Sequence, residues 1–200
     1  STTTGNIVPK VLTATASASN KTYDGGTTAS TTLTFSGLVG SETLGQTVGS
    51  TFDNKNVGSN KSVSVNSITL ADGSGLAANY SISAGQTTTA NITAKSLTVS
   101  GITASNKTYD GNGVATLDAS SVAYSGIVSG DTFNGTYTGA FSDKNVGTGK
   151  TVTITPSYSG ADVNNYSITN HAVLTANITV RSLTVSGVAA LDKTYDGSVT

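Results

Sequence analysis

Few side chains in this sequence can transfer protons or attack a substrate. The 200 residues contain one histidine, His171, one glutamate, Glu42, and no cysteine. General acid–base catalysis and nucleophilic catalysis depend on such groups, and catalytic metal sites use the same residue types. We therefore expect a protein that is not an enzyme and that carries no cofactor.

The string that repeats most regularly and holds reactive side chains is Lys-Thr-Tyr-Asp-Gly. It begins at Lys21, Lys107 and Lys193, so consecutive copies are 86 residues apart. A tyrosine beside an aspartate can form a binding pair, whereas Asp-Gly is a signal for a tight turn. Because the string occurs once per repeat, we interpret it as a structural turn in which Asp24 and Asp110 accept backbone N–H groups.

Further strings recur at related spacings. Asn79-Tyr80-Ser81-Ile82 returns after 86 residues, whereas Lys55-Asn56-Val57-Gly58 returns after 89 residues. The second copy therefore gains three residues between 111 and 126 and loses three between 152 and 166, as loops tolerate. The residues that define the repeat are Lys21, Tyr23, Asp24, Gly25, Lys55, Asn79, Tyr80, Lys107, Tyr109, Asp110, Gly111, Lys144, Asn165 and Tyr166.

The period divides the chain into modules. We predict a first module at 1–94, a second at 95–180 and the start of a third at 181–200. The junction at Ala94-Lys95 contains no Gly/Ser-rich or Pro-rich linker, so adjacent modules should meet stiffly and stack as an extended rod.

Alternating apolar residues predict about six or seven short strands in each module. Val63 and Val65 alternate with serines, after which Ile68 and Leu70 take the opposite parity, which predicts a bulge near residues 66–67. The pattern favours an all-β fold of tandem immunoglobulin-like β-sandwiches, with a β-grasp-like sheet as the alternative. The segments 37–44 and 126–133 are expected to form one helical turn over the core.

Charge and hydropathy exclude two classes of partner. The net charge of −1, the sequence pI near 5.6 and the lack of a Lys/Arg cluster argue against nucleic acid. No run approaches the ~18 apolar residues that a membrane span requires.

Together, Lys21 to Gly25, Phe52 to Gly58, Asn79 to Ile82 and Ala90 to Lys95 resemble the YDG-type repeats of large bacterial exoproteins. Those exoproteins are similar to filamentous haemagglutinins, adhesins and biofilm-matrix proteins. The resemblance covers essentially the whole chain. It implies a secreted stalk section at the bacterial cell surface, with neighbouring repeats of the same chain as its partners.

The loops carry residue types that suit two further chemistries. Lys55 and Lys144, with the acids Asp24 and Asp110 and the amides Asn79 and Asn165, could supply an intramolecular isopeptide crosslink. Plain hydrogen bonding is the favoured interpretation, because a lysine in such a loop usually stays solvated. Calcium is disfavoured, because the loop residues Asp53, Asn54, Asp72, Asp131 and Asp162 form no Asp-x-Asp-x-Asp run.

The leading functional hypothesis is a non-catalytic spacer that projects a distal binding region and so supports adhesion or biofilm formation. The alternative is a carbohydrate- or surface-binding module in which Tyr23, Tyr80, Tyr109 and Tyr166 are exposed aromatic platforms. Contact with host or matrix glycans through other regions of the parent protein is compatible with both hypotheses.

Overall fold

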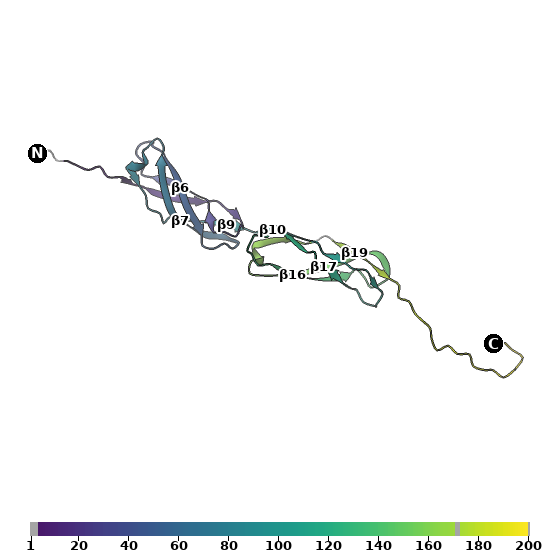
Figure 1. Cartoon of the computed structure of the whole chain (residues 1–200). Coiled ribbons are helices and arrows are strands. Elements are labelled where there is room, and N and C mark those ends of the chain that lie inside the picture. Colours follow the sequence, from purple (N-terminus) through teal and green to yellow (C-terminus); the bar gives the residue numbers. More distant parts are fainter. Residues whose placement is uncertain (1–3, 171–172, 200) are drawn as a thin grey trace. The chain divides into compact units, whose positions relative to one another are not determined.

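The structure, a computed structural model, describes residues 4–170 and 173–199. Its regular elements there are β-strands and two 3-10 helices, η1 (Ala77–Asn79) and η2 (Val163–Asn165). The prediction of an all-β protein is confirmed (Figure 1). Neither of these short helices has the length and apolar character needed to cross a membrane.

The chain divides into two compact units. Unit 1 takes the described residues of Ser1–Gly101, Ser120–Thr136 and Pro156–His171, and unit 2 takes those of Ile102–Ala119, Tyr137–Thr155 and Ala172–Thr200. The hydrogen-bonded sheets join strands either within residues 10–93 or within residues 95–179. The predicted module boundaries after residues 94 and 180 stay predictions.

The largest sheet of unit 1 has the strand order β3-β9-β7-β6-β4. Strands β6, β7 and β9 lie side by side and antiparallel (Figure 1), whereas β3 runs parallel to β9 with Lys21 opposite Ile92. The strands are β3 (Lys21–Thr22), β4 (Thr28–Ala29), β6 (Leu44–Phe52), β7 (Gly58–Asp72) and β9 (Thr87–Thr93).

Smaller sheets complete unit 1. Strand β2 pairs antiparallel with β5, β1 pairs parallel with β8, and β10 lies between β15 and β18. The bounds are β1 (Lys10–Val11), β2 (Thr13–Ala18), β5 (Thr31–Ser36), β8 (Tyr80–Ser81), β10 (Lys95–Ser100), β15 (Ala123–Ser125) and β18 (Tyr166–Thr169).

The five-stranded sheet of the second sequence copy has the corresponding order β12-β19-β17-β16-β13, and most of it belongs to unit 2. Strands β11 and β14 form a separate pair. The bounds are β11 (Thr103–Ala104), β12 (Lys107–Thr108), β13 (Val114–Ala115), β14 (Leu117–Asp118), β16 (Asn134–Phe141), β17 (Gly147–Ser159) and β19 (Leu174–Thr179).

A bulge interrupts the pairing of β6 with β7, as the parity switch predicts. Gly49 lies opposite Ser67 and Ser50 lies opposite Val65, so Asn66 is the extra residue. One extra residue turns the following side chains to the other face of the strand. Val65 before the bulge is accordingly buried on the core side.

Buried apolar residues form two clusters. The first includes Tyr23, Phe52, Val63, Ile92 and Leu97, together with buried Ala29, Ala90, Phe133 and Tyr166. The second includes Ala115, Phe141, Val152, Ala176 and Ile178. Val63 and Val152 stand 89 residues apart and are both fully buried, so the two sequence copies place equivalent residues in their cores.

The predicted helical turns at 37–44 and 126–133 are wrong, because neither segment is helical. Glycines with positive φ, such as Gly37 (103°) and Gly126 (101°), start each segment in a conformation that a right-handed helix cannot contain. Single turns closed by Glu42 N–H to Val39 O and by Asp131 N–H to Val128 O occupy these positions.

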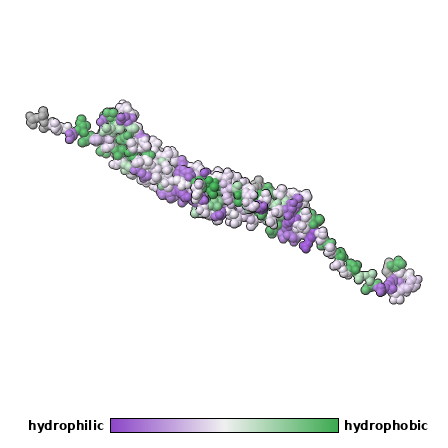
Figure 2. All heavy atoms as spheres, in the orientation of Figure 1, coloured by the Kyte–Doolittle hydropathy of each residue, from purple (hydrophilic) through white to green (hydrophobic). Residues whose placement is uncertain are grey.

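Residues 181–199 contain no strand. Leu183 is 88% exposed, whereas its equivalent Leu97 in β10 is fully buried. Exposed apolar side chains of this segment account for the hydrophobic stretch near the C-terminus in Figure 2. The apolar alternation of this segment therefore lacks a core to pack against among the described residues.

Candidate functional site

The Lys-Thr-Tyr-Asp-Gly string folds into a turn that its own lysine and aspartate close. The Lys21 ammonium lies 2.7 Å from Asp24 and 2.8 Å from the Gly26 carbonyl, and the Gly26 N–H donates to Asp24 at 2.9 Å. Gly25 has a φ of 80°, which side-chain-bearing residues rarely adopt. The hydrogen bond from Lys21 lowers the pKa of Asp24 below its ordinary value.

The same turn recurs in the later copies of the string. Lys107 lies 2.7 Å from Asp110, which accepts the Asn112 N–H at 3.2 Å, and Lys193 lies 2.8 Å from Asp196. The prediction that the aspartate of the first two strings accepts a backbone N–H is confirmed. The string is thus a self-contained turn motif in every copy.

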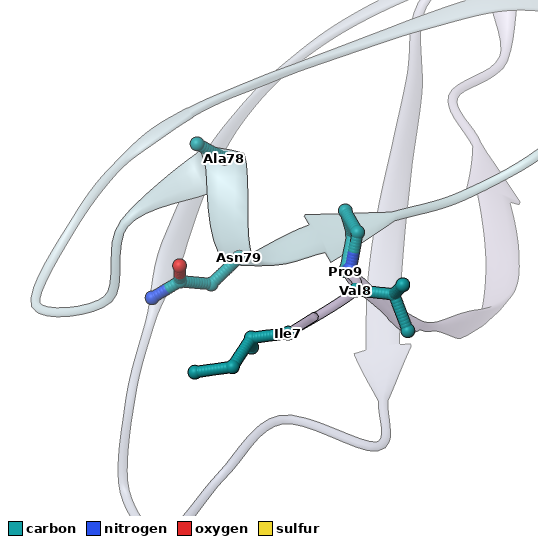
Figure 3. A pocket seen from close by; sticks show the side chains of 5 residues that line it. All are labelled: Ile7, Val8, Pro9, Ala78 and Asn79. Atoms are coloured by element: carbon teal, nitrogen blue, oxygen red, sulfur yellow. The ribbon is translucent and has the colours of Figure 1, made fainter. Parts of the chain in front are cut away.

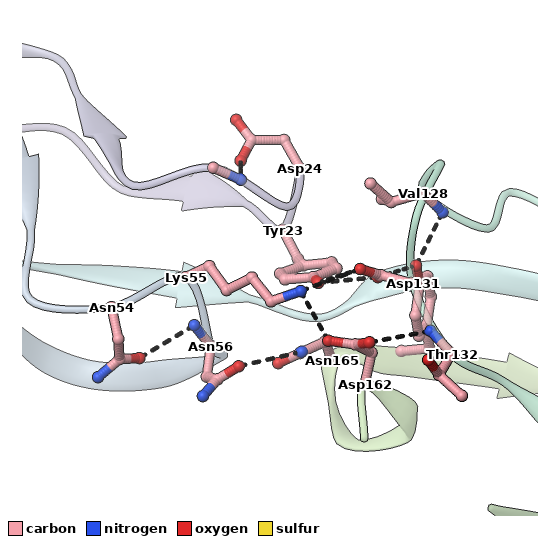
Figure 4. A network of polar contacts seen from close by, with 12 residues as sticks. Tyr23, Asp24, Asn54, Lys55, Asn56, Val128, Asp131, Thr132, Asp162 and Asn165 are labelled. Atoms are coloured by element: carbon pink, nitrogen blue, oxygen red, sulfur yellow. Dashed lines mark hydrogen bonds and ion pairs between the residues drawn. The ribbon is translucent and has the colours of Figure 1, made fainter. Parts of the chain in front are cut away.

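A second group of polar residues, the Asp131 cluster, consists of Tyr23, Lys55, Asp131, Asp162 and Tyr166 and lies within unit 1 (Figure 4). At its centre, the Asp131 side chain is only 3% exposed. Its carboxylate accepts the Tyr23 hydroxyl at 2.8 and 3.0 Å, the Tyr166 hydroxyl at 2.6 Å and the Lys55 ammonium at 3.1 Å. A buried carboxylate with this many donors has its hydrogen-bonding capacity met.

Lys55 connects the two carboxylates of the Asp131 cluster. Its ammonium lies 2.7 Å from Asp162 and 3.1 Å from Asp131, and 5.9 Å from the centre of the Tyr23 ring. The Tyr23 and Tyr166 rings meet edge to face, with their centroids 5.6 Å apart. The positive charge of Lys55 therefore compensates the two carboxylates beside the edge-to-face pair of tyrosine rings.

The contacts fix the protonation states of the cluster. Burial alone would raise the pKa of Asp131, but hydrogen bonds from Tyr166, Tyr23 and Lys55 outweigh it and lower that pKa. The hydrogen bond from Lys55 lowers the pKa of Asp162, and the hydrogen bonds to Asp162 and Asp131 raise the pKa of Lys55.

The tyrosines of the cluster stay protonated. Burial and the hydrogen bond to Asp131 raise the pKa of Tyr166 to about 12, and the same causes raise the pKa of Tyr23. At neutral pH both carboxylates are thus ionised, Lys55 is charged and both phenols are neutral. None of these groups has a pKa shifted toward 7, so the arrangement suits a stabilising contact better than proton transfer.

Neighbouring backbone groups position the loops of the cluster. Asp162 accepts the Thr132 N–H at 2.9 Å, and Asn165 in η2 accepts the Val57 N–H at 3.0 Å. The Asn165 amide also donates to the Asn56 side chain at 3.3 Å. The two bonds of Asn165 tie the loop that precedes β7 to the loop that contains η2, and the bond of Asp162 ties the latter loop to Thr132.

The structure brings four predicted repeat-defining residues together: Tyr23, Lys55, Asn165 and Tyr166. It places Asp24 in its own turn instead. Sequence reasoning missed that Asp131 and Asp162 are the partners of Lys55. A signal existed for Asp131, because Glu42 stands 89 residues earlier and both copies therefore carry an acid there.

The first sequence copy holds a similar arrangement around Tyr80. The Tyr80 hydroxyl donates to Glu42 and accepts the Val39 N–H at 3.1 Å, and the bond to Glu42 raises the pKa of Tyr80. Asn79 is exposed there. A cavity of about 360 Å³ adjoins it (Figure 3), lined by Ile7, Val8, Pro9, Ala78 and Asn79.

The second sequence copy repeats the residues around Lys55 with greater exposure. Lys144 is exposed where Lys55 is 37% exposed, and Val146 is 48% exposed where Val57 is half-buried. Tyr109 is half-buried, whereas Tyr23 is buried. The residue types found at Tyr23, Lys55 and Val57 thus occur a second time, at Tyr109, Lys144 and Val146.

The geometry favours an ion pair at Lys55 over an isopeptide crosslink. The residues facing the ammonium are Asp131 and Asp162, and the pKa of Lys55 is raised. A protonated amine has no free electron pair with which to attack a carboxamide.

The loop aspartates with oxygen atoms suited to calcium bind other partners. Asp131 and Asp162 pair with Lys55, Asp53 pairs with Lys61 at 2.8 Å, and Asp72 accepts the Ala77 N–H at 2.7 Å. No group of three or more His, Cys, Asp or Glu side chains that suits a metal ion occurs among the described residues.

The prediction of exposed tyrosine platforms is wrong for three of the four residues. Tyr23, Tyr80 and Tyr166 are buried, because their rings pack in the core and their hydroxyls bond to acids, and Tyr109 is half-buried. These rings do not present a face to solvent on which a sugar could stack. His171, noted as the single histidine, lies outside the described residues.

Comparison with known families gives one match. The YDG domain model matches the chain twice, at residues 8–90 and 93–173. No curated protein and no solved structure matches the chain.

Proposed function

The chain belongs to the YDG domain family, and we propose that it is a non-catalytic stalk segment of a secreted bacterial surface adhesin. In this role the repeats hold a distal binding region away from the cell and so support adhesion or biofilm formation. The chemical inventory is in keeping with this proposal, because the polar residues that recur serve turns and contacts between loops.

The Asp131 cluster is the observation that carries the proposal. It joins Tyr23 and Lys55, from the first sequence copy, to Asp131, Asp162 and Tyr166, from the second copy, within unit 1. A spacer must resist bending where one repeat follows the next. A satisfied, largely buried polar network fixes such a junction in one geometry better than a flexible linker does.

We propose for the modules an immunoglobulin-like sandwich arranged in tandem along an extended rod. Two features support this architecture: each copy contains a five-stranded sheet and smaller sheets that supply buried residues, and one residue, Ala94, separates β9 from β10. The β-grasp-like alternative contains a helix packed on its sheet, and the described residues hold only three-residue helices.

Small-angle X-ray scattering on chains with increasing numbers of repeats tests the stalk. Each added repeat should lengthen the maximum dimension by a constant increment of roughly 40–50 Å, since strands of this length rise about 3.3 Å per residue. In the 200-residue chain, Lys55→Ala should broaden the distribution of dimensions, whereas Lys10→Ala, at an exposed residue outside the Asp131 cluster, should not. A maximum dimension that does not grow with repeat number would refute the proposal.

A further inference from the structure

An asparagine precedes a glycine at two places in the chain, Asn112-Gly113 and Asn134-Gly135. The backbone nitrogen of the second residue can attack the asparagine side-chain carbonyl, and glycine hinders this attack least because it has no Cβ. Asn112 is exposed and lies in the loop before β13, whereas Asn134 and Gly135 belong to β16, which lies between β17 and β13 in the sheet. The pair in the loop is therefore the freer of the two to form a ring.

Two donors bind the side-chain oxygen of Asn112. The Lys107 ammonium lies 3.0 Å from Asn112 Oδ1, and the Val114 N–H donates to the same atom at 2.9 Å. When a nucleophile attacks the carbonyl carbon Cγ, negative charge develops on this oxygen. Donors held at about 2.7–3.1 Å from such an oxyanion stabilise it.

The turn itself holds the Lys107 ammonium in place. Lys107 also binds the Asp110 carboxylate at 2.7 Å. The first sequence copy holds Lys21 in the same way, but Gly26 stands there 86 residues before Asn112. The turn thus positions an ammonium in both of these copies, and in the second copy the ammonium faces an amide.

The position of Asn112 stays open to water where another repeat follows. The first copy shows this, because a Cβ at Gly25 would lie 2.8 Å from Val128 of the second copy. At the next residue, Gly26, a Cβ would have the Asp24 carboxylate at 3.5 Å as its one contact within 4 Å outside its chain neighbours. A following repeat therefore packs beside this position without covering it.

The aspartate of the same turn resists the equivalent reaction. Asp110 also precedes a glycine, Gly111, but the hydrogen bond from Lys107 lowers the pKa of Asp110 and keeps its carboxylate ionised. A negative charge repels an approaching nucleophile, whereas the neutral amide of Asn112 does not.

We propose that Asn112 is a site of spontaneous deamidation that the Lys107 turn promotes, a property beyond the stalk function. The Gly113 nitrogen loses its proton and attacks Cγ of Asn112, so that an N–Cγ bond forms. The bond from Cγ to the side-chain nitrogen breaks, and ammonia leaves with the proton. Water then opens the cyclic imide at one of its two carbonyl carbons and leaves aspartate or isoaspartate at residue 112.

Both products change the edge of the second five-stranded sheet. Each adds a carboxylate beside Lys107, and isoaspartate also lengthens the backbone ahead of β13. This strand is the last of its sheet and pairs with β16 through Val114 and Ala115. Isoaspartate at residue 112 therefore weakens the attachment of the edge strand as the protein ages.

Incubation of the whole chain at mildly alkaline pH, followed by peptide mapping with mass spectrometry, tests this inference. The peptide that contains Asn112 should gain, with time, the mass difference between an amide and a carboxylate. In the folded chain this conversion should be roughly tenfold faster at Asn112 than at Asn134. In concentrated urea, which removes both the turn and the sheet, the two sites should convert at similar rates.

Two variants separate the parts of the mechanism. Gly113→Ala should slow the conversion roughly tenfold, and the fold should tolerate it, because Gly113 has no positive φ and a Cβ there would lie 3.7 Å from the Phe141 carbonyl. Lys107→Met should slow the conversion by a similar factor through the loss of one donor. Lys21→Met removes the matching ion pair of the first copy and should leave the rate at Asn112 unchanged.

Three results would overturn the inference: no conversion at Asn112, equal rates at Asn112 and Asn134 in the folded chain, or a Lys107→Met chain that converts as fast as wild type. None of them affects the growth of dimension with repeat number, so the two proposals fail separately.

Discussion

At the Asp131 carboxylate, two phenols and one ammonium donate to two buried oxygens. The lowered pKa of Asp131 means that folding favours its ionised form. Its contribution to stability is therefore complete above the ordinary aspartate pKa of 3.8 and is lost as the pH falls through the lower, folded value. This residue makes the junction sensitive to acid.

Asp131→Asn should lower the free energy of unfolding by about 2 kcal/mol at pH 7, because two phenols and Lys55 lose an ionised acceptor. The difference from wild type should shrink as the pH falls below 4. Urea unfolding at pH 7, 5 and 3 measures both effects. Asp192→Asn, at an exposed position, serves as the control, and an equal loss of stability at every pH would contradict the assignment.

Tyr166 should be among the last tyrosines to ionise. Its pKa of about 12 predicts a late step in the absorbance titration of the phenols, and Tyr166→Phe should remove that step. Because the folded pKa is raised, the contribution of this phenol to stability is complete below pH 10 and declines as the pH rises through about 12. Tyr195→Phe, at an exposed residue, should leave the late step in place.

At the residue scale, the sequence predicted the local contacts and missed the distant ones. Asp-Gly spacing is enough to predict that Asp24 binds its own turn, because both partners lie within three residues. The pairing of Lys55 with Asp162 joins residues from two different loops. Leu76 stands 86 residues before Asp162, and in the first copy Ser74 accepts the corresponding backbone N–H, so the two copies could not reveal it.

At the element scale, β10 anchors the second sequence copy through Leu97. This side chain is fully buried and belongs to the first core cluster. Leu97→Ala should lower the free energy of unfolding by roughly 2–5 kcal/mol in urea titrations. Leu183→Ala alters the equivalent residue of the third copy, which is 88% exposed, and should change it by less than about 0.5 kcal/mol. Equal effects of the two substitutions would contradict the burial of Leu97.

The longer strands were predictable, because their apolar residues alternate. The number of strands was not: six or seven were predicted in each module, and the described residues hold nine strands in the first copy and ten in the second, because strands of two residues are too short to show alternation. The bulge at Asn66 was predictable from the alternation, since the parity of Val65 and Ile68 differs. The turn at 37–44 was not, because its apolar spacing suits a helical turn, while the positive φ of Gly37 and Gly40 prevents one. Backbone conformation at glycine is decided by the surrounding fold, so spacing alone does not reveal it.

At the scale of the whole molecule, residues 181–199 form a long segment that has no strand and whose side chains are exposed. Brief trypsin treatment should therefore cut after Arg181 before it cuts after Lys21 or Lys107, whose side chains are held in turns. Mass spectrometry of the products checks the order. Early cleavage after Lys21 would contradict the stability of the first turn.

The two copies of the repeat in this chain were predictable from the 86-residue period, and the family from the strings that recur, because that information lies along the chain. The composition of the two compact units was not. Unit 1 includes the described residues of 120–136 and 156–171 as well as the first copy, and within it Asp131 and Asp162 bind Lys55. Contacts of this kind depend on the geometry of the loops, which the spacing between repeated strings does not determine.

The parallel pairing of β3 with β9 has a mechanical consequence for the first sequence copy. Lys21 lies opposite Ile92, and the Tyr23 N–H extends the ladder to the Thr93 carbonyl at 2.8 Å. A pull that separates the start of β3 from the end of β9 draws the two strands in opposite directions along their length. The hydrogen bonds between the two strands are then loaded in shear and must break together. The first copy therefore resists the pull until all of these hydrogen bonds break in one step.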